Sequence, residues 1–238
     1  MSITAELEPL VHTSINEAVY RRLRDHLMRG DYAAGDVLGI QELADAFGTS
    51  AMPVREALRR LAAQRAVEPM KSRSMRVPVM SDERLEDIRR TRVLIEGTAT
   101  AWAVSHVTPS ELAQLRMLAD QIGESLAHPE SVDSGLEINQ KFHFTIYRGA
   151  RSASMLAMIE SLWLQSGPYL RATRELMHST KRPSSEFHAR IVQAMEQGDA
   201  IGAQQAMESD ICWAFDKLKD QSSADTRQTR RLPATELP

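Results

Sequence analysis

The sequence has few of the features that define secreted or membrane proteins. A single cysteine, Cys212, excludes an internal disulfide bond. No run of about 18 apolar residues occurs, so no membrane-spanning helix is expected. Residues 1–13 contain acids and no apolar stretch, which is unlike a secretory leader. These absences, together with 42% hydrophobic and 26% charged residues, predict a globular protein of the cytoplasm.

The charge is unevenly distributed along the chain. The net charge is −3, which does not suggest a protein that binds nucleic acid. Residues 46–80, however, hold seven basic and two acidic side chains, whereas residues 81–238 hold 18 basic and 22 acidic ones. A basic patch attached to an acidic body favours phosphate binding at one end. The alternative, a solvated basic helix face, stays open at this point.

The N-terminal third has the pattern of a winged helix-turn-helix. Helical periodicity predicts helices over 14–29, 40–47 and 52–64. Gly48 would end the second helix, and Thr49 and Ser50 can cap the third. Extended segments at 67–70 and 75–79 flank a polar tip with Lys71 and Arg73, which predicts a small hairpin wing. The third helix is rich in arginine, as in helices that enter the major groove.

The rest of the chain is helical in period. We expect helices over 82–105, 109–127, 132–149, 152–178, 184–197 and 199–219, with the first capped by Ser81. Six helices without strands between them predict an all-α bundle. The expected organisation is therefore a flexible N-terminus at 1–13, a DNA-binding domain at 14–79, a helical domain at 80–221 and a disordered polar tail at 222–238.

Two motifs make the chain resemble a known family. The segments Ile40–Ala44, Phe47–Ser50 and Pro53–Leu61 resemble the signature of GntR-family transcription regulators. The helical half is similar to the FadR-type effector domain called FCD, in its six-helix, VanR-like form. The motifs there are Arg92-x-x-x-Glu96, Phe142-His143 and Glu186-Phe187-His188. The resemblance implies a homodimeric regulator, more often a repressor, that binds a palindromic operator under the control of a small organic or sugar acid.

Candidate DNA contacts follow from the predicted reading helix. Arg55 can donate two hydrogen bonds to guanine, although a phosphate contact or a salt bridge with Glu56 or Glu42 is the alternative. Arg59, one turn later, suits a phosphate. Thr49 and Ser50 can bind phosphate at the helix N-terminus. Ala51 stands where the family often has arginine, which leaves the operator sequence open. The full set of expected DNA contacts is Thr49, Ser50, Ala51, Arg55, Arg59, Lys71 and Arg73.

The resemblance also implies a metal site that this chain alters. The family's aspartate and three histidines correspond to Asn139, His143, His188 and Asp210. Two histidines and one carboxylate can still bind Zn²⁺, Mn²⁺, Ni²⁺ or Fe²⁺. The alternative is a polar pocket in which Asn139 and the histidines contact the effector directly.

Arg92 matches a family arginine that faces the same cavity and could clamp the effector's carboxylate. Its alternative partner is Glu96, one turn away. Trp163 and Tyr169 could line the cavity, although such side chains more often belong to the core. Two other classes of function are compatible with these residues. One is an iron-dependent enzyme that uses the histidines, and the other is a DNA-binding dimer that responds to no ligand.

Overall fold

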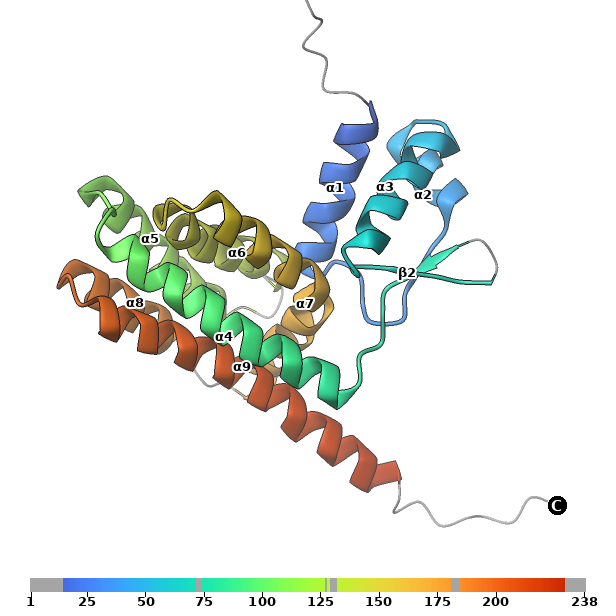
Figure 1. Ribbon diagram of the computed structural model, residues 1–238. Coiled ribbons are helices and arrows are strands. Elements are labelled where there is room, and N and C mark those ends of the chain that lie inside the picture. Colours follow the sequence, from blue (N-terminus) through green and yellow to red (C-terminus); the bar gives the residue numbers. More distant parts are fainter. Residues whose placement is uncertain (1–14, 72–73, 127, 129–131, 181–184, 230–238) are drawn as a thin grey trace, which may run out of the picture.

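The computed structural model describes residues 15–71, 74–126, 128, 132–180 and 185–229, without the side chains of 174–180, 185 and 219–229. A small three-helix head lies at one end of a larger helical bundle, and a short linker after the wing joins the two (Figure 1). Among the described residues, no helix is long and apolar enough to cross a membrane.

The head contains α1 (Ile15–Arg29), α2 (Ile40–Phe47) and α3 (Ala51–Ala63). The apolar stripe of α1 (Val19, Leu23 and Leu27) is buried against α3. Gly48 ends α2 in the left-handed conformation, with φ 62° and ψ 38°, as predicted. Ser50 occupies the cap position of α3, but its side chain accepts no capping hydrogen bond, so that part of the prediction was wrong.

The wing is a hairpin of β2 (Glu68–Pro69) and β3 (Met75–Arg76), as expected, but it has a third strand. The strand β1 (Val37–Leu38) pairs with β3 and gives the sheet order β1-β3-β2, antiparallel throughout. With only two residues, β1 is too short to show the alternation of apolar and polar residues that predicts a strand. Lys71 is exposed near the tip, whereas Arg73 lies outside the described residues.

The bundle contains six helices in the described part of the chain, as predicted. They are α4 (Asp82–Val104), α5 (Pro109–Leu126), α6 (Val132–Gly149), α7 (Ala153–Thr180), α8 (Ser185–Glu196) and α9 (Ala200–Thr229). Ser81 caps α4 by accepting a hydrogen bond from the Arg84 amide at 3.3 Å. The long helices α4 and α9 lie side by side (Figure 1).

The C-terminal end of α9 corrects a second prediction. The helix continues to Thr229, ten residues past its predicted end, so residues 222–229 are helical rather than irregular. No glycine or proline interrupts the segment before Pro233, and each added helical residue gains a backbone hydrogen bond. Residues 230–238, and the expected flexible segment 1–13, lie outside the described residues.

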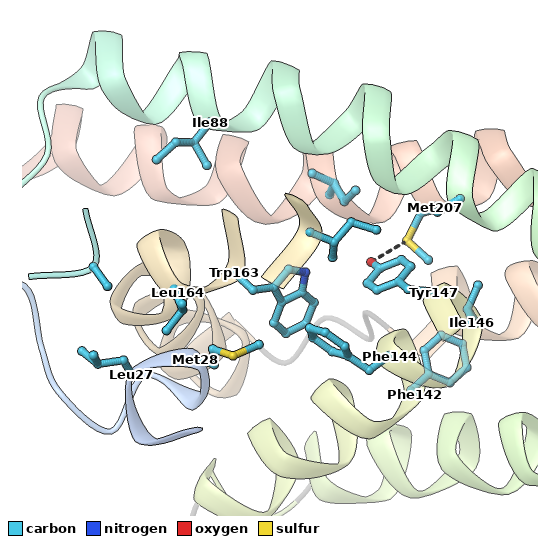
Figure 2. Packing of buried hydrophobic residues seen from close by; sticks show 14 of the residues in the cluster. Leu27, Met28, Ile88, Phe142, Phe144, Ile146, Tyr147, Trp163, Leu164 and Met207 are labelled. Carbon is cyan, nitrogen blue, oxygen red and sulfur yellow. Dashed lines mark hydrogen bonds between the residues drawn. The ribbon is translucent and has the colours of Figure 1, made fainter. Parts of the chain in front are cut away.

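One hydrophobic core extends from the head into the bundle. Figure 2 shows Leu27 and Met28 of α1 near Leu164 of α7, with Trp163 of α7 reaching Phe144 of α6. Trp163 is 1% exposed and is among the largest fully buried side chains. Because the apolar side chains of both parts belong to one cluster, a displacement of α7 would be felt by α1.

The close approach of α1 and α7 depends on two glycines. A Cβ atom on Gly167 would lie 1.8 Å from the carbonyl oxygen of Leu27, and one on Gly30 would lie 2.3 Å from the oxygen of Gly167. Arg171 of α7 donates to the carbonyl of Gly30, and Tyr169 accepts the Met80 amide at 2.6 Å. The helix α7 is therefore bonded to the head and to the linker.

Candidate functional site

The reading helix α3 presents its N-terminal turns to solvent. Ser50, Arg55 and Arg59 are exposed, and Thr49 and Ala51 are partly exposed. Within the described residues, no ion pair or hydrogen bond involves the side chain of Arg55 or Arg59. The alternative pairing of Arg55 with Glu56 or Glu42 is therefore not formed. Ala51, Arg55 and Arg59 are spaced by four residues and share one helix face.

Two other basic side chains of this region, Arg60 and Arg76, have internal roles. Arg60 donates to Glu17 of α1 at 2.8 Å and stacks over the ring of Tyr20, with its guanidinium carbon 3.6 Å from the ring centroid. Arg76 pairs with Glu68 across the wing. Some of the basic side chains counted in the sequence therefore stabilise the head, and others remain available to bind a ligand. Sequence reasoning also missed Met52, an apolar residue of α3 that is 69% exposed.

A cavity of about 50 Å³ lies inside the bundle between α4, α6, α7, α8 and α9. It is lined by Arg92, Leu136, Asn139, His143, Trp163, Leu170, Thr173, His188, Asp210, Ile211 and Ala214. This volume admits an ion with a few waters or a very small organic anion. All five residues predicted for the effector and the metal therefore line one cavity, as does Trp163. Tyr169 bonds the linker instead of lining it.

His143, His188 and Asp210 converge inside the cavity. One ligand-type atom from each lies within 4.8 Å of the others. Nε2 of His143 is 3.5 Å from Oδ2 of Asp210, and Nε2 of His188 is 3.1 Å from Oδ1 of Asn139. Both histidines are buried, with exposed fractions of 3% and 2%. Two nitrogens, one carboxylate and one amide oxygen form a donor set that fits a divalent transition metal.

Burial and neighbouring charges set the protonation of this cluster. Burial lowers the pKa of His143 well below its ordinary value, and the neighbouring His188 and Arg92 act in the same direction. His143 is therefore neutral, which is the form that binds metals. Burial raises the pKa of Asp210, although His188 and Arg92 oppose that rise. A cation between the two side chains would favour the ionised carboxylate.

Arg92 is paired with Glu96, which is the second of its two predicted alternatives. Its Nε donates to Oε1 of Glu96 at 2.6 Å and one Nη donates to Oε2 at 3.2 Å. The other Nη donates to Ser166 at 3.3 Å. Burial disfavours the charge of Arg92, but Glu96 outweighs this effect and raises its pKa above the ordinary value. A guanidinium has five N–H groups, so these contacts leave part of it for a ligand in the cavity.

Sequence reasoning missed two groups beside the cavity. Ser166 anchors Arg92, and Tyr147 donates to Glu96 while lying 3.3 Å from Nδ1 of His143. Tyr147 follows His143 by four residues, as His143 follows Asn139, so helical spacing alone could have identified it. Burial, with the charge of Glu96, raises the pKa of Tyr147 well above its ordinary value, so the hydroxyl keeps its proton.

The head and the cavity together define a class of protein. A winged helix-turn-helix with free arginines on its reading helix, joined through one core to a bundle with a polar cavity, is a DNA-binding regulator. Residues 15–77 match the family model "Bacterial regulatory proteins, gntR family", and residues 87–211 match the FCD domain. The chain therefore belongs to the GntR family of bacterial transcription regulators, in the branch that carries an FCD domain.

Individual relatives agree with this assignment. The chain is 28% identical over 197 residues to the HTH-type transcriptional regulator McbR of Escherichia coli K12, covering 82% of this chain and 89% of McbR. The solved structure of E. coli McbR/YncC has a TM-score of 0.82 and 27% identity, over 89% of this chain and all of that one. The HTH-type transcriptional repressor GlaR of E. coli K12 is 28% identical over 60% of this chain and 67% of its own length. The family consists of transcription regulators, so the predicted regulator is confirmed and the enzyme alternative is excluded.

Proposed function

We propose that this regulator is a cytoplasmic, homodimeric repressor whose operator binding is controlled by a small organic or sugar acid in the bundle cavity, with a divalent metal bound there. The observation that carries the proposal is the convergence of His143, His188 and Asp210 on one buried cavity. Repression rests on relatives such as GlaR, which is named a repressor.

His143, His188 and Asp210 would hold the metal, with the amide oxygen of Asn139 as a weaker fourth donor. Zn²⁺, Mn²⁺, Ni²⁺ and Fe²⁺ all accept such a mixed set of nitrogen and oxygen ligands. When bound, the cation would supply a positive anchor for an effector carboxylate. Asn139 and the remaining N–H groups of Arg92 would orient the effector, and the cavity of about 50 Å³ favours a small organic acid over a bulkier sugar acid.

Two copies of the α3 helix would read the two halves of a palindromic operator. Arg55 would contact a base, and Arg59 would contact a phosphate. Thr49 and Ser50 would bind phosphate at the helix start, with Ala51 against a thymine methyl group. Lys71 and Arg73 would extend the contact from the wing.

The helix α7 is the element best placed to pass a signal from the cavity to the head. Trp163 and Thr173 of α7 line the cavity. Gly167 and Arg171 of the same helix contact the end of α1. An effector that binds more tightly to one position of α7 would therefore shift the position of the reading helix. The shift in free energy cannot exceed the difference between the effector's binding free energies for the two positions.

Metal content and ligand-induced stabilisation test this proposal. Protein purified without chelator should contain about one equivalent of a divalent metal by elemental analysis. A screen of small carboxylates should raise the melting temperature, because a ligand at about 100 times its Kd adds about 2.7 kcal/mol of stability. His143→Ala should lose the metal, whereas His106→Ala, an exposed site, should keep it. A wild-type protein that binds neither metal nor acid would instead support a DNA-binding dimer without a ligand.

A further inference from the structure

The carboxylate of Glu96 is buried completely, with 0% exposure, and four hydrogen bonds converge on it. Arg92 donates two of them, Trp163 donates one from Nε1 at 3.2 Å, and Tyr147 donates the fourth. An ionised carboxylate only accepts hydrogen bonds. The direction of each bond at Glu96 is therefore fixed, including the bond from the Tyr147 hydroxyl.

Tyr147 has a single hydroxyl proton, and Glu96 is its strongest acceptor. The hydroxyl also lies 3.6 Å from the sulfur of Met207, which Figure 2 shows, but a thioether accepts far more weakly than a carboxylate. With its proton directed to Glu96, the Tyr147 oxygen can only accept from its remaining neighbour, Nδ1 of His143 at 3.3 Å. That nitrogen must therefore carry the ring proton.

A neutral imidazole has one N–H, so a proton on Nδ1 leaves Nε2 of His143 with a lone pair. This is the nitrogen that faces Oδ2 of Asp210 at 3.5 Å. When Asp210 is ionised, its oxygen and this nitrogen are two acceptors facing each other in a buried site. They repel, and a positive ion between them removes the repulsion. His188 is arranged differently, because its Nε2 faces Oδ1 of Asn139 at 3.1 Å.

We propose that Glu96 and Tyr147 form a positioning relay that holds His143 in the Nδ1–H tautomer and thereby keeps its Nε2 ready to bind a metal ion. Arg92 serves this relay by orienting the Glu96 carboxylate through the bidentate contact. The effect on metal binding rests on the proposed function. The assignment of the tautomer does not depend on that function. Partners of this kind are expected to change metal affinity about 10–100-fold without touching the ion.

The tautomer is measured first, on full-length, metal-free protein. Nitrogen-15 NMR of histidine-labelled protein distinguishes the two tautomers, and the His143 signal is assigned by its absence in His143→Ala. We expect the Nδ1–H form in the wild type and a shift toward Nε2–H in Tyr147→Phe. An Nε2–H tautomer in the wild type overturns the inference whether or not any metal binds.

Zinc affinity is the second readout, with Zn²⁺ alone as the probe in calorimetric titrations. Tyr147→Phe should weaken Zn²⁺ binding at least tenfold while keeping one site per chain and a cooperative thermal transition. The control is Tyr20→Phe, which removes a hydroxyl bonded to Gln64 in the head and should leave zinc affinity unchanged. Equal zinc affinity in Tyr147→Phe and the wild type contradicts the relay. A wild type that binds no zinc contradicts the proposed metal site, and the tautomer result still decides the relay.

Discussion

Arginine is used in opposite ways at the two ends of this molecule. On α3, Arg55 and Arg59 extend into solvent without a partner among the described residues. In the bundle, Arg92 is 3% exposed and is bonded to Glu96 and Ser166. A free guanidinium at the surface costs little and is available to DNA, whereas a buried one must be paired. Burial thus distinguishes arginines that are available to a ligand from an arginine that organises a buried site.

The largest effect is expected where the buried arginine loses its partner. Glu96→Ala leaves the charge of Arg92 buried and unpaired and should lower the free energy of unfolding by about 3–5 kcal/mol, measured by urea denaturation. The matched control is Glu137→Ala on α6. It also breaks an i,i+4 ion pair, with Lys141 at 2.8 Å, but both side chains are about half exposed. Its loss should stay below about 0.5 kcal/mol. A similar loss of unfolding free energy in both variants would show that burial does not set the contribution of these ion pairs to stability.

A smaller effect is expected for the free arginine assigned to base readout. Arg55→Ala should reduce affinity for the specific operator by about 1–3 kcal/mol, or roughly 5- to 150-fold, and relax the preference at one base pair. Its melting temperature should match that of the wild type, because no described residue bonds the side chain. Fluorescence anisotropy with a duplex selected from a random library measures the affinity. Operator affinity within a few-fold of the wild type would show that α3 is docked differently.

The smallest expected effect is a difference in salt dependence of DNA binding between Arg59→Ala and Arg60→Ala. Arg59→Ala should weaken binding to all DNA sequences about equally and reduce the slope of log affinity against log salt by about one. Arg60→Ala removes a side chain already bonded to Glu17 and stacked on Tyr20, so the salt slope should not change. Salt titrations of both variants provide the comparison, and a loss of slope in Arg60→Ala would reverse the assignment.

The sequence was sufficient for the elements whose ends have strong local chemistry. Gly48 ended α2 and Ser81 capped α4 as predicted, and the helix expected over 14–29 was found as α1. It did not reveal β1, which depends on pairing with the distant β3, or the continuation of α9 to Thr229. A short strand forms through pairing with a distant strand, and a helix can extend by adding one hydrogen-bonded residue at a time. A local sequence pattern detects neither effect.

The site was predictable in its membership but not in its bonding. Family positions placed Asn139, His143, His188 and Asp210 together, and the structure brings all four to one cavity. The sequence could not show whether Arg92 bonds Glu96, because Arg92 could equally have bonded a ligand. The structure decides this, since the two side chains are buried together and form an ion pair. Tyr147 was overlooked for the same reason, since its role depends on which atoms surround its single proton.

Control of the reading helix by the cavity can be measured as a change in operator affinity. Operator affinity of the full-length protein is measured by anisotropy with and without metal and each acid that stabilises the protein, for the wild type and for His143→Ala. A metal and acid pair should change wild-type affinity about 5- to 150-fold and leave the variant unchanged. A wild-type affinity that stays constant under every condition, while metal and acid are demonstrably bound, would contradict this control.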